Sequence, residues 1–100
     1  MTEDDEKAVN LLLDALDKLY DGKLPAPKLR SALLETKIDS AELAAEVRQA
    51  AQALDGVVRL DTRVAPPYDE RYSAALRITA SLRSLLADLY DEIWASRRRW

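Results

Sequence analysis

Residues 68–96 read YDERYSAALRITASLRSLLADLYDEIWAS, a stretch without glycine or proline. Its apolar side chains recur at steps of three and four residues, which places them on one face of an α-helix. On a helical projection they cover close to half of the circumference, more than one neighbouring helix needs. The stretch therefore predicts a long final helix that is covered on two sides. The apolar positions are Tyr72, Leu76, Ile78, Leu82, Leu85, Leu86, Leu89, Tyr90, Ile93 and Trp94.

The opposite arc of this helix is polar and is expected to face solvent. A helix over 68–96 would be roughly 44 Å long. A compact chain of this size, treated as a sphere, would have a diameter of roughly 34 Å. We therefore expect the last helix to extend beyond its own domain. The polar arc consists of Arg77, Ser81, Ser84, Asp88, Asp91 and Glu92.

Two helices are expected in the first third of the chain. The first covers about 2–21, with Thr2 as its N-cap and Gly22 as the residue that ends it. The prolines that follow prevent this helix from continuing. Pro27 suits the first turn of a second, short helix that ends near Thr36.

A third helix and an extended connector are expected in the middle of the chain. Asp39 or Ser40 caps the helix, which runs to about Leu54 and is rich in alanine. In the connector, residues 57–65, apolar and charged side chains then alternate with a period of two. Because the sequence has no second strand candidate, the connector either lies against the bundle as a loop or pairs with its own copy in another subunit.

Together these elements predict an all-α fold with a single helical-bundle domain over residues 1–100. The bundle has three main helices plus one short helix, and the long C-terminal helix is its spine. Composition agrees, because 48% hydrophobic and 33% charged residues are ordinary for a folding chain and only 2 residues are glycine. Such a chain is long enough for one hydrophobic core.

Several classes of function are disfavoured by residues that the chain lacks. Without cysteine there are no disulfides, thiol nucleophiles or thiolate metal sites, and without histidine the commonest general base and metal ligand is missing. We therefore predict no catalytic, cofactor-binding or metal site and no enzymatic activity. The N-terminus is acidic, unlike a signal peptide, and no apolar run reaches the length of a membrane span, so a cytoplasmic location is predicted.

Three short motifs resemble functional patterns but fit structural roles better. The segment from Asp17 to Gly22 is similar to the front half of a calcium-binding loop, yet Leu19 and Lys28 occupy ligand positions. The second and third helices have the lengths of a DNA-reading helix-turn-helix, but the would-be recognition helix begins with glutamates. Pro66-Pro67-Tyr68 lacks the spacing of a WW-domain ligand, and its prolines instead end the connector.

Charge is distributed unevenly along the chain. Residues 1–21 hold seven acids against two lysines, whereas residues 66–100 hold six arginines against five acids. The two ends can meet within one bundle, meet in a neighbouring copy, or bind different partners. An acidic stripe on the first helix offers a surface for a basic partner or is simply a solvated face; it comprises Glu3, Asn10, Asp14, Asp17 and Asp21.

The end of the last helix carries the candidate interface. Aromatic side chains and arginines, the types enriched at the centres of protein interfaces, gather there. Alternatively, Tyr90 and Trp94 pack onto the end of the hydrophobic core of their own chain. The candidate residues are Tyr90, Trp94, Arg97, Arg98 and Trp100.

These observations predict a protein-protein interaction module without enzymatic activity. It would be a small regulatory, inhibitor or assembly subunit that self-associates through its C-terminal helix. Its size and acidic charge are also those expected of an immunity or antitoxin-like protein, a comparison that rests on the class of protein and on no family motif. The alternative is a nucleic-acid-binding accessory protein that uses the arginines at 97–99. A small-molecule sensor with a pocket inside the bundle also stays open.

Overall fold

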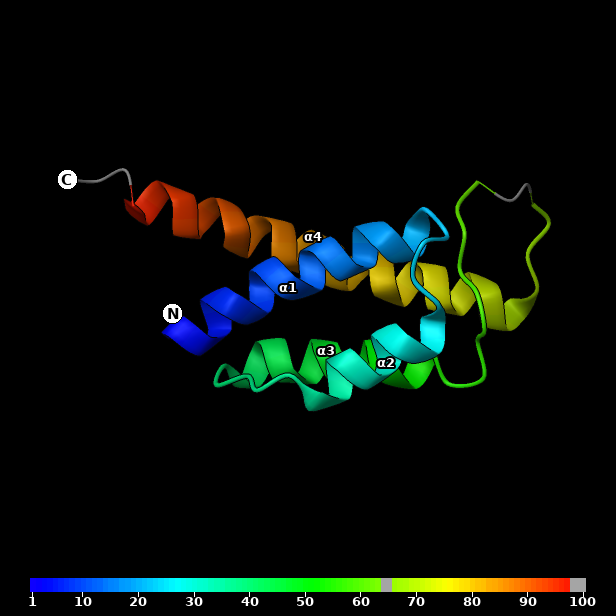
Figure 1. Ribbon diagram of the computed structural model, residues 1–100, viewed down its shortest axis with the longest axis horizontal. Helices are drawn as coiled ribbons and strands as arrows, with labels where there is room; N and C mark the ends of the chain where they lie inside the picture. Colours follow the sequence, from blue (N-terminus) through cyan, green and yellow to red (C-terminus); the bar gives the residue numbers. More distant parts are fainter. Residues whose placement is uncertain (64–65, 98–100) are drawn as a thin grey trace.

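All the segments predicted to be helical form helices in the computed structural model, which describes residues 1–63 and 66–97. They are α1 (Glu3–Tyr20), α2 (Ala26–Glu35), α3 (Ala41–Ala53) and α4 (Glu70–Arg97) (Figure 1). No strand is present in this part of the chain. The predicted all-α bundle, with α2 as the short helix and α4 as the long one, is confirmed.

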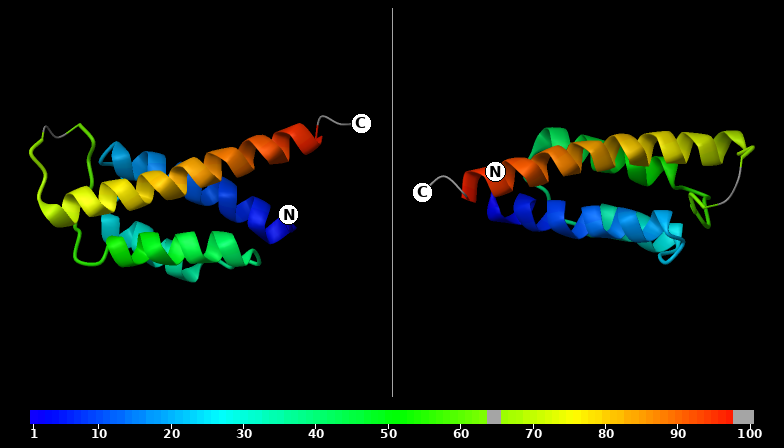
Figure 2. Two further views of the ribbon diagram at one scale, coloured as in Figure 1. Left: turned by 180° about the vertical axis from the view of Figure 1, so that it is seen from behind. Right: turned by 90° about the horizontal axis from the view of Figure 1, so that it is seen from above.

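The helices form a closed ring of contacts. α4 packs against α1 and α3, and α2 also packs against α1 and α3. Going around the bundle, the helices therefore follow the order α1, α4, α3, α2. Seen from above, α1 and α2 lie in one layer and α3 and α4 in the other (Figure 2). The prediction that α4 is covered on two sides is therefore correct.

The core contains the apolar face of every helix. Leu82 and Leu86 of α4 are fully buried together with Leu12 and Leu16 of α1. The polar arc predicted for α4 is exposed at each of its positions. Two small residues of α4, Ala75 and Thr79, are also fully buried, although the apolar pattern did not include them.

The last turns of α4 were predicted to extend beyond the domain, and in the structure α1 still flanks them. The molecule is elongated, with extents of 48 × 23 × 19 Å, and α4, with 28 residues and a length of about 42 Å, runs along most of its long axis (Figure 1). Ile93, near the helix end, is only 6% exposed, and Arg97 reaches Glu6 of α1. The sequence-based estimate of the diameter treated the bundle as a sphere, whereas the bundle is elongated along α4. α3 does end short of these last turns, which leaves α1 beside them (Figure 1).

The helix ends follow the expected capping chemistry. Thr2 accepts a hydrogen bond from the Asp5 amide at 3.2 Å, and Gly22 adopts a φ of 72°. Ser40 caps α3 by accepting from the Leu43 amide at 3.3 Å, which selects it over Asp39. α4 begins at Glu70, slightly later than expected.

The start of α4 is set by Asp69. Its carboxylate accepts a hydrogen bond from the Tyr72 amide at 2.7 Å, the geometry of an N-cap. The predicted start near Tyr68 therefore lies two residues too early, because the helix begins where the Asp69 side chain can accept from a free amide of the first turn.

The connector between α3 and α4 lies against its own bundle. Thr62 donates its amide to the carbonyl of Tyr20 at 3.0 Å, and Ala26 donates to the carbonyl of Val58 at 3.2 Å. Leu60 is fully buried. Over residues 57–63 the loop alternative is therefore the observed one; positions 64 and 65 lie outside the described residues.

Candidate functional site

Two aromatic side chains form the exposed feature of the C-terminal half of α4. Tyr90 and Trp94 lie one helical turn apart, with ring centroids 6.1 Å apart and planes tilted by 58°. Tyr90 is half-buried against the core, whereas Trp94 is 44% exposed. Together with Asp91 and Ala95 they line a shallow surface groove. Tyr90 thus combines the core role and the surface role that the sequence left open, while Trp94 is mainly a surface residue.

Arg97, one of the two arginines predicted at the interface, does not line this groove. Arg97 lies 3.4 Å from the carboxylate of Glu6, so it is directed toward the start of α1. Arg98 and Trp100 lie outside the described residues. Of the predicted interface residues, the structure therefore brings Tyr90 and Trp94 together and places Arg97 beside an acidic partner.

The acidic and basic ends of the chain meet within the bundle at two points. Asp17 of α1 accepts a hydrogen bond from Arg83 of α4 at 2.8 Å, and Glu6 pairs with Arg97. Both pairs are exposed enough to contribute little net stability. Their positions agree with the antiparallel packing of α1 and α4 (Figure 1). Asp17, which the calcium-loop comparison would use as a ligand, is engaged by an arginine instead.

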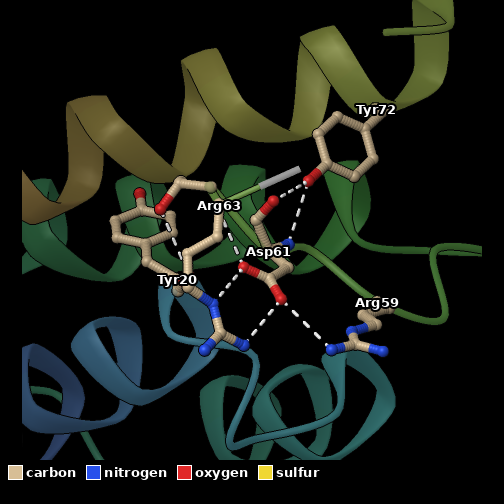
Figure 3. A network of polar contacts seen from close by, with 6 residues as sticks. Tyr20, Arg59, Asp61, Arg63 and Tyr72 are labelled. Carbon is tan, nitrogen blue, oxygen red and sulfur yellow. Dashed lines mark hydrogen bonds and ion pairs between the residues drawn. The ribbon is translucent and has the colours of Figure 1, made fainter. Parts of the chain in front are cut away.

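A second polar cluster, which sequence reasoning missed, anchors the connector (Figure 3). Asp61 is only 3% exposed, and its carboxylate accepts hydrogen bonds from the guanidinium groups of Arg59 at 3.1 Å and Arg63 at 2.9 Å. Tyr72 of α4 donates its hydroxyl to the Asp61 carbonyl at 2.7 Å and accepts from the Asp61 amide at 2.9 Å. The alternation of arginine and aspartate at 59, 61 and 63 was the available signal.

This cluster also explains Gly22. Besides its positive φ, a Cβ atom at this position would lie 2.6 Å from the Asp61 carboxylate and 2.8 Å from the Arg63 guanidinium. Any side chain here would therefore displace the paired side chains of Asp61 and Arg63 as well as strain the turn. The residue that ends α1 is also the residue against which the connector packs.

Tyr20 and Thr79 make a polar contact inside the bundle. Tyr20 donates its hydroxyl to the Thr79 hydroxyl at 3.0 Å, and Thr79 donates to the carbonyl of Ala75 at 2.7 Å. Burial raises the pKa of Tyr20, opposed by the hydrogen bond to Thr79. The contact joins the end of α1 to the middle of α4.

Asp5 is the second buried acid. It is 3% exposed, and its carboxylate accepts hydrogen bonds from the backbone amides of Asp39 at 2.7 Å and Ser40 at 3.1 Å. It thereby holds the loop between α2 and α3 against the start of α1. The helical register provides a signal, since Asp5 precedes Val9 and Leu12 by one and two turns and so lies on the buried face.

Acid titration is expected to weaken the Asp61 cluster. Hydrogen bonds from the side chain and backbone of Arg63, with a further one from Arg59, hold the pKa of the Asp61 carboxyl well below its ordinary value near 3.8. The stability that depends on this carboxylate is therefore present above about pH 4 and lost as the pH falls toward the lowered pKa. We predict that Asp61→Asn destabilises the protein at neutral pH and that its deficit relative to wild type shrinks at pH values below about 3.

Urea denaturation of both proteins at neutral and acid pH measures this effect. A deficit of the same size at every pH would contradict the ionised anchor.

No protein-family model, curated protein sequence or solved structure matches this chain. The helices over residues 1–63 and 66–97 include none that is both long and apolar enough to cross a membrane. Among those residues, too, no group of three or more acidic, histidine or cysteine side chains is arranged to hold a metal ion.

Proposed function

We propose that this protein is a protein-protein interaction module that self-associates through the C-terminal half of α4. The observation that carries the proposal is Trp94, which is 44% exposed and lines a groove with Tyr90. An exposed tryptophan beside a half-buried tyrosine offers a large apolar area at little cost in side-chain entropy, and such residues dominate binding energy at interfaces. Since the apolar half of α4 is already covered by α1 and α3, the partner would cover the outer edge of the helix.

The role we propose is that of a small cytoplasmic regulatory, inhibitor or assembly subunit without enzymatic activity. The nucleic-acid alternative receives less support, because Arg59, Arg63, Arg83 and Arg97 each contact a carboxylate and the chain is acidic, with a net charge of -3. Arginines that are paired in this way are less available for phosphates. A protein surface therefore remains the preferred partner.

The double variant Tyr90→Ala with Trp94→Ala is expected to keep the helical fold and to self-associate about 30-fold more weakly, or worse. The reason is that one strong interface side chain typically contributes about 2 kcal/mol or more to binding. Sedimentation velocity over a concentration series measures the change. Leu34→Ala is the matched control, since Leu34 is also an exposed apolar residue, at 58%, but lies on α2. It should leave association unchanged.

Trp94→Ala alone separates binding from folding, because Trp94 is exposed and Tyr90 packs against the core. The single variant should keep the wild-type melting temperature and still associate more weakly. A wild type that stays monomeric at millimolar concentration would remove the proposal.

A further inference from the structure

One row of positions along α4 has the spacing of a coiled-coil contact. Its members, which we term the outer seam, are separated by alternating steps of four and three residues, the pattern of contact positions in a heptad repeat. Six of the seven are exposed and Ala87 is half-buried, so neither α1 nor α3 covers the row. The outer seam consists of Ser73, Arg77, Ala80, Ser84, Ala87, Asp91 and Trp94.

The outer seam is complementary to itself when it is read in the opposite direction. About a centre at Ser84, an antiparallel copy places Arg77 opposite Asp91, because each lies seven residues from the centre. Ala80 and Ala87 lie four and three residues from the centre, and Ser73 and Trp94 lie eleven and ten, so each of these pairs is offset by one residue. The opposite charges therefore face each other, the large Trp94 lies near the small Ser73, and a two-fold axis makes each contact occur twice.

The two charges of the outer seam are available for such a contact. Arg77 and Asp91 are exposed, and neither forms an ion pair with another residue of the described ranges 1–63 and 66–97. The other positions are small, apart from Trp94, which allows two helices to approach closely. Asp91 also lines the Trp94 groove, so an arginine from a second copy would pair with it and lie near the Trp94 ring.

We propose that two copies of this chain pair antiparallel along the outer seam of α4, with Ser84 at the two-fold axis and Arg77 of each copy against Asp91 of the other. This inference rests on the proposed self-association and adds its partner, direction and register. Residues 73–94 span about 33 Å of helix, and a strip about 12 Å wide would bury on the order of 400 Å² per copy, roughly half of a standard interface. The dimer is therefore weak, with a dissociation constant in the micromolar range or above.

Charge reversal tests the register. Arg77→Glu places a glutamate against Asp91 in both halves of the dimer, and Asp91→Arg places two arginines together, so each single variant should self-associate about tenfold more weakly or worse than wild type. An equimolar mixture of the two single variants restores both attractive pairs and should associate at least as well as wild type. The double variant, Arg77→Glu with Asp91→Arg, should also recover.

Sedimentation equilibrium at millimolar concentration provides the readout, and circular dichroism verifies that each variant keeps its fold. Arg48→Glu, an exposed reversal on α3, is the control for the change in net charge and should associate as wild type does. A parallel pairing predicts single variants that associate as strongly as wild type, because residue 77 would then face residue 77.

Two results would overturn the inference, and they differ in what they say about the proposed function. If wild type dimerises through Trp94 but both single variants associate normally or fail to rescue each other, the register is wrong and the interface remains. If wild type is monomeric at every concentration, both the register and self-association are wrong, and the outer seam faces a different protein or solvent.

Discussion

The substitution Leu86→Asp is expected to unfold the protein or leave it aggregated. Leu86 is fully buried in the core cluster on the face of α4 that packs within the bundle. The variant loses the packing of a leucine and leaves a carboxylate in the core without a partner, and together these cost about 5 kcal/mol or more. A domain of this size is stable by only about 5 to 15 kcal/mol, so the folded state would be largely lost. Leu82→Asp should behave in the same way.

Ser81→Asp is the control for this experiment, because it introduces the same charge on the exposed arc of the same helix, outside the outer seam. It should keep the wild-type far-ultraviolet circular dichroism spectrum and a melting temperature within a few degrees of it. An unchanged melting temperature for Leu86→Asp would mean that α4 presents a different face to the bundle.

The substitution Asp5→Ala is expected to destabilise the protein by about 2 to 4 kcal/mol, because it removes the charged acceptor of two part-buried hydrogen bonds from backbone amides. Those amides belong to Asp39 and Ser40, and no other acceptor for them is evident in the described residues. Asp5→Asn keeps one acceptor oxygen and should lie between the alanine variant and wild type. Urea denaturation measures the free energies of unfolding.

Glu3→Ala is the matched control, since Glu3 is an exposed acid in the same helical turn and its ion pair with Lys7 lies at the surface. It should change stability by less than about 1 kcal/mol. Hydrogen exchange adds a local readout: the amides of Asp39 and Ser40 should exchange faster in Asp5→Ala than in Glu3→Ala. Equal stability of the two variants would show that Asp5 does not hold the loop.

Local sequence patterns were sufficient for the helices and most of their ends. The spacing of leucines in 68–96 and the cap at Thr2 depend on residues within one or two turns of each other. Gly22 likewise ends α1 through its own φ of 72°. The contact between Tyr90 and Trp94 in the candidate site also follows from helical spacing, because residues four apart are neighbours on any helix.

Contacts between residues that are distant in sequence could not be predicted from those local patterns. Asp5 bonds to amides 34 and 35 residues away, and Tyr20 bonds to Thr79 across 59 residues. Each pairing requires the chain to be folded before the two groups are close, so neither segment carries its signal alone. The length of α4 relative to its domain depended in the same way on the elongated shape of the bundle, which arises from how the helices pack side by side.

The amino-acid sequence was thus enough to establish which segments are helical and which of their faces are apolar, since both follow from interactions between near neighbours. Tertiary packing was needed to establish which faces stay uncovered. α1 and α3 cover the apolar half of α4, and Trp94, at the edge of that half, remains 44% exposed. Exposure is a property of what lies opposite a side chain, and that neighbour comes from elsewhere in the chain.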